Sequence, residues 1–558
     1  MSAHHNGSPP DVVIVGAGHN GLTAACYLAR EGLQVLVVEA SPTVGGMTST
    51  NATLASAPGH FFNEGAIQLT GIFRLSGIAQ ELELAKFGLR EIPVDPAHVQ
   101  LAPDGSSFAV WKDVDRSVAE LRHFSKQDAR AWLDYSNALY PVLGVMIAYM
   151  KSQPTRPWNR DMFKELIGAA RRPGRLWSLR HMITASHTEF LDETFETELP
   201  KGALAAMAAF SQMRLDMTAW AMIYLGIVQR VSNAMPIGGT GALPAALHKC
   251  LLAHGGTVRT SAPVEEILVS ANRATGVRLE SGEVIQARRA VLTTCNPTLT
   301  LNKLLPEGSL PDTLAWRAKD IPIRKTHATS LKINVALKGH VTMDAHEQWR
   351  GDGLDLRKYL LAWHTLAEQD AGWNALVRGE WPDPVPISCV IIPSAVDPTQ
   401  APEGCDNLWL WSGVIPVTPR IPWEDVRDQI GDSVLKDCAQ YYKGLDTLEI
   451  DRAVLGGPDL EARFNAPAGN VYHVDPLISR FGPMRPAPGL GAYRLPIDGL
   501  YLSGAGTHPT GGVCALPGKL AAQALLHDGA SPIQRTLKAM RSAPVVSAPP
   551  EPVGVPER

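Results

Sequence analysis

The residues with the clearest chemical potential are three closely spaced glycines near the N-terminus. Gly16, Gly18 and Gly21 follow an apolar run at residues 11–15 and precede leucines and alanines at helical spacing. Such a turn between strand and helix lets backbone N–H groups and a helix N-terminus approach a pyrophosphate. Glu39 ends the next apolar run, residues 35–38, where a carboxylate can bind ribose hydroxyls. The pattern predicts a dinucleotide site with contacts from Gly16, Ala17, Gly18, Asn20, Gly21, Glu39 and Ala40.

The alternative interpretation is a glycine turn that binds no ligand. The complete order of strand, turn, helix and strand, ending in an acidic residue, favours the dinucleotide. Glu39 also disfavours a 2′-phosphate, which would be expected beside an arginine. A second glycine pair follows as Gly45-Gly46-Met47. It resembles the extension that passes close to FAD in flavoproteins of the glutathione reductase type, which implies FAD rather than NAD.

Two later stretches extend this prediction. The strand pattern at residues 263–265 resembles the strand by which such flavoproteins hold the adenine, and this implies backbone contacts near Val264. Strand patterns at 264–269, 275–280 and 289–293 predict an antiparallel meander. A glycine loop at 504–512 then precedes a helix at 515–526, which suits a ribityl phosphate and the C2 carbonyl edge of a flavin. The predicted contacts there are Gly504, Ala505, Gly506, Gly511 and Gly512.

Lys332 and His508 are the candidate catalytic residues. Lys332 alternates with the apolar residues of a strand at 330–337, so it lies on the face opposite an apolar layer. In the related amine oxidases, a lysine in a comparable strand holds a water against flavin N5. The alternative is an ordinary exposed lysine on a half-buried strand. His508 and His473 could meet near the flavin, although a single histidine is more often structural.

Composition excludes several classes of protein. The chain has 558 residues, 45% of them hydrophobic, and a net charge of -4 from 51 basic and 55 acidic residues, which gives no reason to expect nucleic acid. Seven dispersed cysteines without a CxxC pair argue against a disulfide framework or any metal site. They favour a reducing compartment, taken here as the cytoplasm. The first ten residues have the form of neither a signal peptide nor a transit peptide.

The length predicts two domains whose segments alternate along the chain. The FAD-binding domain is expected at residues 11–70, 232–296 and 457–541, and the substrate domain at 71–231, mostly helical, and 297–456. Residues 1–10 and the proline-rich tail 542–558 are expected to be disordered.

The segment 151–180 combines charge and apolar surface. Basic residues from Lys151 to Arg180 are interleaved with tryptophan, phenylalanine and leucine. A basic amphipathic segment of this kind can lie on an anionic membrane and bring a lipophilic substrate inward. The alternative is a solvated basic face over an apolar stripe that packs on the core, as is common in helices of soluble proteins.

The motifs GAGHNGL, Gly45-Gly46, GGTGAL at 238–243 and YLSGAGTHPTGG at 501–512 resemble the phytoene desaturase-like flavoproteins. This family includes carotene desaturases, ketolases and a mitochondrial branch, pyridine nucleotide-disulfide oxidoreductase domain-containing protein 2. The resemblance implies an α/β fold with a Rossmann-type, non-covalent FAD site and a discontinuous α+β substrate domain.

The expected function is oxidation of a hydrophobic, carotenoid- or isoprenoid-like small molecule, with hydride transfer to flavin N5 and oxygen or a quinone as electron acceptor. One alternative is a flavin amine oxidase acting on a C–N bond. Another is a non-catalytic binding protein on the same fold, as in the Rab escort proteins. The complete glycine set disfavours that last alternative. The oligomeric state cannot be predicted from the sequence.

Overall fold

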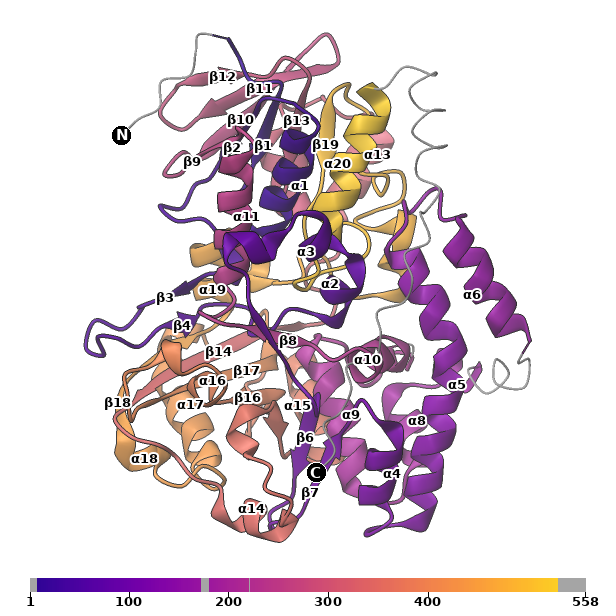
Figure 1. Ribbon diagram of the computed structural model, residues 1–558, viewed down its shortest axis with the longest axis vertical. Coiled ribbons are helices and arrows are strands. Elements are labelled where there is room, and N and C mark those ends of the chain that lie inside the picture. The colour runs from indigo at the N-terminus through magenta and orange to yellow at the C-terminus, as the bar shows by residue number, and fades with distance from the viewer. Residues whose placement is uncertain (1–7, 172–179, 220, 530–558) are drawn as a thin grey trace.

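A five-stranded parallel sheet forms the upper part of the molecule (Figure 1). The computed structural model describes residues 8–171, 180–219 and 221–529. The strand order is β19 (Leu500–Leu502), β13 (Ala290–Thr293), β1 (Val12–Val15), β2 (Val35–Val38) and β9 (Thr257–Arg259). All residues of β1 and β2 are buried, as expected for strands covered on both faces.

Different layers cover the two faces of this sheet. Val12 and Ile14 face a core with the helices α1 (His19–Arg30), α11 (Ala242–Ala253) and α20 (Leu516–Gly529). Val13 and Val15 face the antiparallel sheet of β10 (Val264–Ser270), β11 (Arg273–Leu279) and β12 (Val284–Gln286). The predicted α/β class with a Rossmann-type sheet is therefore confirmed.

The predicted meander is partly wrong. Its third strand is β12, whereas residues 290–293 form β13 and pair in parallel with β1 and β19. β13 is buried at every position, which is typical of a central parallel strand rather than of a half-exposed meander strand.

A seven-stranded sheet forms the second layer of the fold, lower left in Figure 1. Its order is β18 (Glu449–Leu455), β14 (Ala328–Leu337), β17 (Asp406–Pro416), β16 (Cys389–Ile391), β15 (Leu361–Ala362), β6 (His98–Leu101) and β7 (Ser107–Val110). One face packs on α17 (Trp423–Cys438) through residues such as Ile333 and Leu410. The other carries Trp409, Trp411 and Ile391, in a separate apolar cluster with Ile67 and Met235.

Helices cover the right side of the molecule (Figure 1). They include α4 (Val114–Leu121), α5 (Lys126–Met150), α6 (Arg160–Ala170), α8 (His187–Thr194), α9 (Glu198–Phe210) and α10 (Ala221–Arg230). The segment expected to be mostly helical also contains the hairpin β6–β7, whose four-residue strands are too short for periodicity to reveal.

The five-stranded sheet takes its strands from three separate stretches of the chain. The domain boundaries themselves stay a prediction. The predicted tail 542–558 and residues 1–7 lie outside the described residues, whereas Pro10 already accepts a hydrogen bond from the Arg288 amide. Among the helices of the described residues, none has the length and apolarity that a membrane span requires.

Candidate functional site

The first glycine turn has the geometry of an anion cradle. Gly16 has φ of +101°, and a Cβ on Gly21 would lie 2.0 Å from the Gly16 carbonyl oxygen. These two glycines allow the turn and the close packing of α1. Gly18 differs, because a Cβ there would meet only the Gly45 oxygen at 4.0 Å. Gly18 also begins α1 without a side-chain cap, so Gly18 leaves both space and free N–H groups for a phosphate.

Glu39 lies at the end of β2, beside this turn. Its carboxylate accepts hydrogen bonds from the backbone N–H groups of Ala17 at 2.7 Å and Ser41 at 2.9 Å. The Glu39 carbonyl accepts from Ala262, two residues before Val264 and the start of β10. Both the ribose-binding candidate and the adenine-binding candidate thus lie at one edge of the parallel sheet. Ala40, the next residue, is exposed there.

The second glycine pair lies directly against the first turn. Gly45 donates a 3.0 Å hydrogen bond to the Ala17 carbonyl and forms a bridge with Gly18. Met47 follows in a short 3-10 helix, Gly46–Thr48, and its carbonyl accepts from Ala66 at 2.8 Å. The predicted continuation of the cofactor site along this segment is consistent with these contacts.

The C-terminal glycine loop, residues 504–512, lies against the same site. Gly504 has φ of +96°, and a Cβ on Gly506 would clash with Pro297 at 2.3 Å. A Cβ on Gly511 would lie 2.7 Å from the Tyr472 ring. The backbone of Gly512 meets the His19 imidazole at the start of α1. His19 and Gly512, which are some 490 residues apart in sequence, therefore meet at one site.

Several buried polar atoms on these loops have no partner among the described residues. Unpartnered buried groups are rare in proteins and require an explanation. A ribityl chain and a pyrophosphate, both rich in hydrogen-bonding oxygens, would supply it. The open space at Gly18 and the carboxylate of Glu39 fit the same group, so the residues present fit FAD. The atoms are His19 Nε2, Asn20 Oδ1, His473 Nδ1, Ser503 Oγ and His508 Nδ1.

Lys332 is fully buried, with 0% of its surface exposed. Its Nζ lies 4.5 Å from the Trp409 ring centroid, donates to the Ile333 carbonyl at 3.3 Å and hydrogen-bonds Asn334 Oδ1. Burial lowers the pKa of Lys332 well below its ordinary value, and the charges of Cys389 and Glu64 only partly oppose this. The expected face is confirmed, whereas the exposed-lysine alternative is wrong because both faces of β14 are covered.

Glu64 contacts the segment that follows the second glycine pair, and its charge acts on Lys332. Its carboxylate accepts hydrogen bonds from Ser49 at 2.9 Å, from Asn51 and, in two contacts at 2.8 and 2.9 Å, from Arg463. Burial alone would raise the pKa of Glu64, but the Arg463 and Asn51 hydrogen bonds outweigh it and hold the pKa below its ordinary value. The carboxylate of Glu64 is thus held ionised beside Ser49 and Asn51.

His508 makes several contacts that are typical of a structural residue. Its Nε2 lies 3.2 Å from the Tyr149 carbonyl, and its own carbonyl accepts from the Tyr493 hydroxyl at 2.6 Å. Its ring packs edge-on against the Tyr149 ring, with centroids 5.0 Å apart. Burial lowers the pKa of His508 to about 4, so the imidazole is neutral at pH 7. A catalytic role stays a prediction that would depend on Nδ1.

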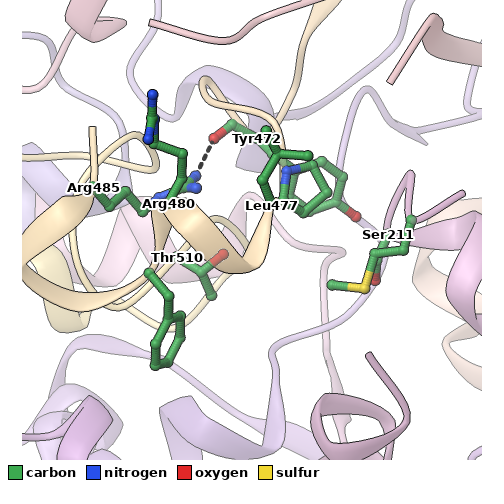
Figure 2. A pocket seen from close by; sticks show the side chains of 9 residues that line it. Ser211, Tyr472, Leu477, Arg480, Arg485 and Thr510 are labelled. Atoms are coloured by element: carbon green, nitrogen blue, oxygen red, sulfur yellow. Dashed lines mark hydrogen bonds between the residues drawn. The ribbon is translucent and has the colours of Figure 1, made fainter. Parts of the chain in front are cut away.

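A hollow lies beside the C-terminal loop (Figure 2). Thr510, which directly precedes Gly511, lines it together with Ser211 and Leu477. Arg485 holds the loop in place, because its Nη2 donates to the carbonyls of Tyr472 at 2.7 Å and Ala505 at 2.8 Å. The remaining lining residues are Met213, Pro476, Arg480 and Phe481.

The chain is similar to several known proteins. The family model described as flavin containing amine oxidoreductase matches residues 21–377. The chain is 30% identical to mouse pyridine nucleotide-disulfide oxidoreductase domain-containing protein 2, with 93% of each chain covered. It is 25% identical to the neurosporene-forming phytoene desaturase of Cereibacter sphaeroides, over 94% of this chain and 95% of the relative.

Among solved structures, the cyclohexylamine oxidase of Brevibacterium oxydans shares the fold, with a TM-score of 0.56 at 16% identity over 93% of this chain and 99% of that one. The resemblance inferred from the motifs is confirmed, and with it the assignment as an enzyme. The chain belongs to the flavin containing amine oxidoreductase family and is an FAD-dependent oxidoreductase.

Proposed function

We propose that this enzyme oxidises a mostly apolar small molecule, with FAD held non-covalently and oxygen or a quinone as electron acceptor. The observation that carries the proposal is one face of the seven-stranded sheet, where the buried amine of Lys332 lies over the Trp409 ring. Trp411 and Ile391 belong to the same apolar cluster as Trp409. When bound, FAD supplies the hydride acceptor. The apolar wall excludes water and orients a substrate that has few polar groups of its own.

Lys332 is the residue proposed to act at the reacting centre. Burial favours its neutral amine, which can hold a water or accept and donate a proton at Nζ. Asn334 and the Ile333 carbonyl orient this amine. Glu64 remains ionised nearby and provides a fixed negative charge, so the site combines one neutral amine with one carboxylate.

An amine oxidase is the second candidate, because two parallel tryptophans could receive a cationic substrate. Trp409 and Trp411 stack with centroids 6.0 Å apart and an interplanar angle of 9°. However, Lys332 of the chain itself already lies over the Trp409 ring. An ammonium group would have to displace it, and this favours the apolar substrate.

The test is anaerobic mixing of the FAD-loaded protein with carotenoid, isoprenoid and amine substrates. Flavin absorbance at about 450 nm is expected to bleach with a member of the apolar classes and to persist with the amines. Bleaching by amines alone would establish the second candidate. A flavin that no apolar substrate reduces would contradict the proposal.

A further inference from the structure

Most of the large apolar side chains of helix α6 are exposed to solvent. Phe163 and Ile167, four residues apart on one face, are each 54% exposed. Trp158, in the loop before the helix, is 68% exposed and stacks on Phe163 with ring centroids 5.8 Å apart. The interpretation of this segment as a basic face over an apolar stripe that packs on the core is therefore wrong for its described part. Residues 172–179 lie outside the described residues.

The buried side of α6 is narrow. Met162 and Ala169 are its buried residues, and the helix packs on α5 (Figure 1). Asn159 caps the helix by accepting from the Met162 amide at 2.9 Å. Small residues at the contact allow the two helices to approach closely. Packing on α5 therefore fixes which face of α6 points outward.

The outward face is also basic. Arg160, Lys164 and Arg171 are exposed and lie near Phe163 and Ile167 at helical spacing. Within the described residues, none of these three cations forms an ion pair with a carboxylate. The acidic Glu165 points the other way, because a Cβ on Gly144 of α5 would lie 2.0 Å from its Oε2. The exposed surface thus presents aromatic and aliphatic groups with three cations beside them, and Asp161, in the first turn, is the exposed acidic residue of this helix.

We propose that α6 and the loop before it, residues 156–171, form a docking surface for an anionic membrane. Lysine and arginine stems lie along apolar surface with their charges outward, and tryptophan favours the lipid–water boundary. The centre of a protein–protein interface is instead depleted in lysine. A second copy of this chain would set the same basic residues against each other, at a cost in repulsion.

The surface is connected through α5 to the hollow beside the C-terminal loop. Tyr149, near the end of α5, contacts Phe481 with ring centroids 5.7 Å apart, and Phe481 lines the hollow of Figure 2. A docked α6 would therefore hold the hollow near the bilayer, where an apolar substrate dissolves. The docking itself requires no particular substrate, so it stands or fails separately from the proposed reaction.

The test is co-sedimentation of the FAD-loaded full chain with phosphatidylcholine vesicles, with and without phosphatidylglycerol. Binding is expected only with phosphatidylglycerol and is expected to fall as salt is added. The variant Arg160→Glu/Lys164→Glu should lower vesicle partitioning by about 30-fold or more. Phe163→Ser/Ile167→Ser should also abolish binding, because the inserted apolar groups are lost.

Trp316→Ser is the matched control for Trp158→Ser, because Trp316 on α13 (Asp312–Lys319) has the same 68% exposure. Only Trp158→Ser should weaken vesicle binding. Flavin absorbance and circular dichroism establish that each variant is folded. A wild-type protein that stays in the supernatant with phosphatidylglycerol overturns the proposal. The proposal is also overturned if the wild type sediments as a dimer without lipid and Phe163→Ser/Ile167→Ser makes it a monomer but leaves vesicle binding unchanged.

Discussion

Lys332 Nζ lies 4.5 Å from the centroid of the Trp409 ring, inside the protein and on the inner face of the seven-stranded sheet. A lysine without exposed surface is rare, because removing its charge from water is costly. Its neighbours stabilise the amine without a direct ion pair: an amide, a carbonyl and an aromatic face. Such a costly arrangement is expected where the amine has a function.

Lys332→Met is expected to retain FAD and to slow flavin reduction or reoxidation by roughly 100-fold. Methionine has a similar volume and removes a buried polar amine, so stability should be unchanged or increased. Anaerobic and aerobic stopped-flow absorbance measure the two half-reactions. Lys338→Met, at the exposed end of the same strand, is the control and should behave as wild type. Equal rates in both variants would contradict the role of Lys332.

Gly18→Ala should mainly weaken FAD binding, whereas Gly21→Ala should mainly lower the stability of the fold. Gly18 has φ of −68° and open space at its Cβ position, so alanine should leave the fold intact and weaken FAD binding about 10-fold or more. Gly21→Ala would clash with the Gly16 carbonyl and should destabilise the protein by about 1–3 kcal/mol or more. Thermal unfolding and FAD titration of the apoprotein separate the effects. Similar unfolding midpoints for the two variants would refute the distinction.

Glu39→Gln should weaken FAD binding by roughly 10-fold, because hydrogen bonds to a charged acceptor exceed those to a neutral one. In the wild type, both carboxylate oxygens of Glu39 accept hydrogen bonds, from the Ala17 and Ser41 N–H groups. The glutamine side chain has only one oxygen, so one of these two hydrogen bonds is lost. Fluorescence titration of FAD into the apoprotein measures the effect. Glu265→Gln changes an exposed carboxylate next to Val264 and should leave affinity unchanged. If both variants bind FAD as wild type does, Glu39 is not a ribose ligand.

Arg463→Met should destabilise the protein by about 2 kcal/mol at pH 7, because Glu64 would remain buried without its cation. The pKa of Glu64 is lower in the folded protein than in the unfolded chain, so its stabilisation is complete above the unfolded pKa and is lost as pH falls through the folded value. The stability difference between variant and wild type should therefore shrink below about pH 4.5. Urea unfolding between pH 4 and pH 7 measures it; a constant difference would contradict the linkage.

Much of the cofactor site could be predicted because its determinants are local. The turn at Gly16, the carboxylate of Glu39 and the loop before Gly511 each carry a short pattern with a backbone reason for each glycine. Alternation in β14 likewise predicted the face of Lys332, although not that both sides of the strand are buried.

The remaining residues of the site could not be predicted because their partners are distant in sequence. Glu64 meets Arg463 across almost 400 residues, and no pattern in the sequence pairs the two. Trp409 and Trp411 share a face by simple alternation, a signal present in the sequence, but only the fold places Lys332 over one ring. For α6, charge and apolar residues were visible, whereas the direction of each face depended on packing against α5.

The parallel sheet has a consequence for the order in which the chain can mature. Its edge strand β19 begins at Leu500, yet it pairs with β13, which in turn pairs with β1 near the N-terminus. On a ribosome, β1 and β2 emerge early, and their other neighbours β9 and β13 follow by residue 293, whereas the edge strand β19 emerges only with Leu500. The sheet and the glycine loop at 504–512 are therefore complete only when most of the chain has been synthesised, so flavin binding is expected late in synthesis.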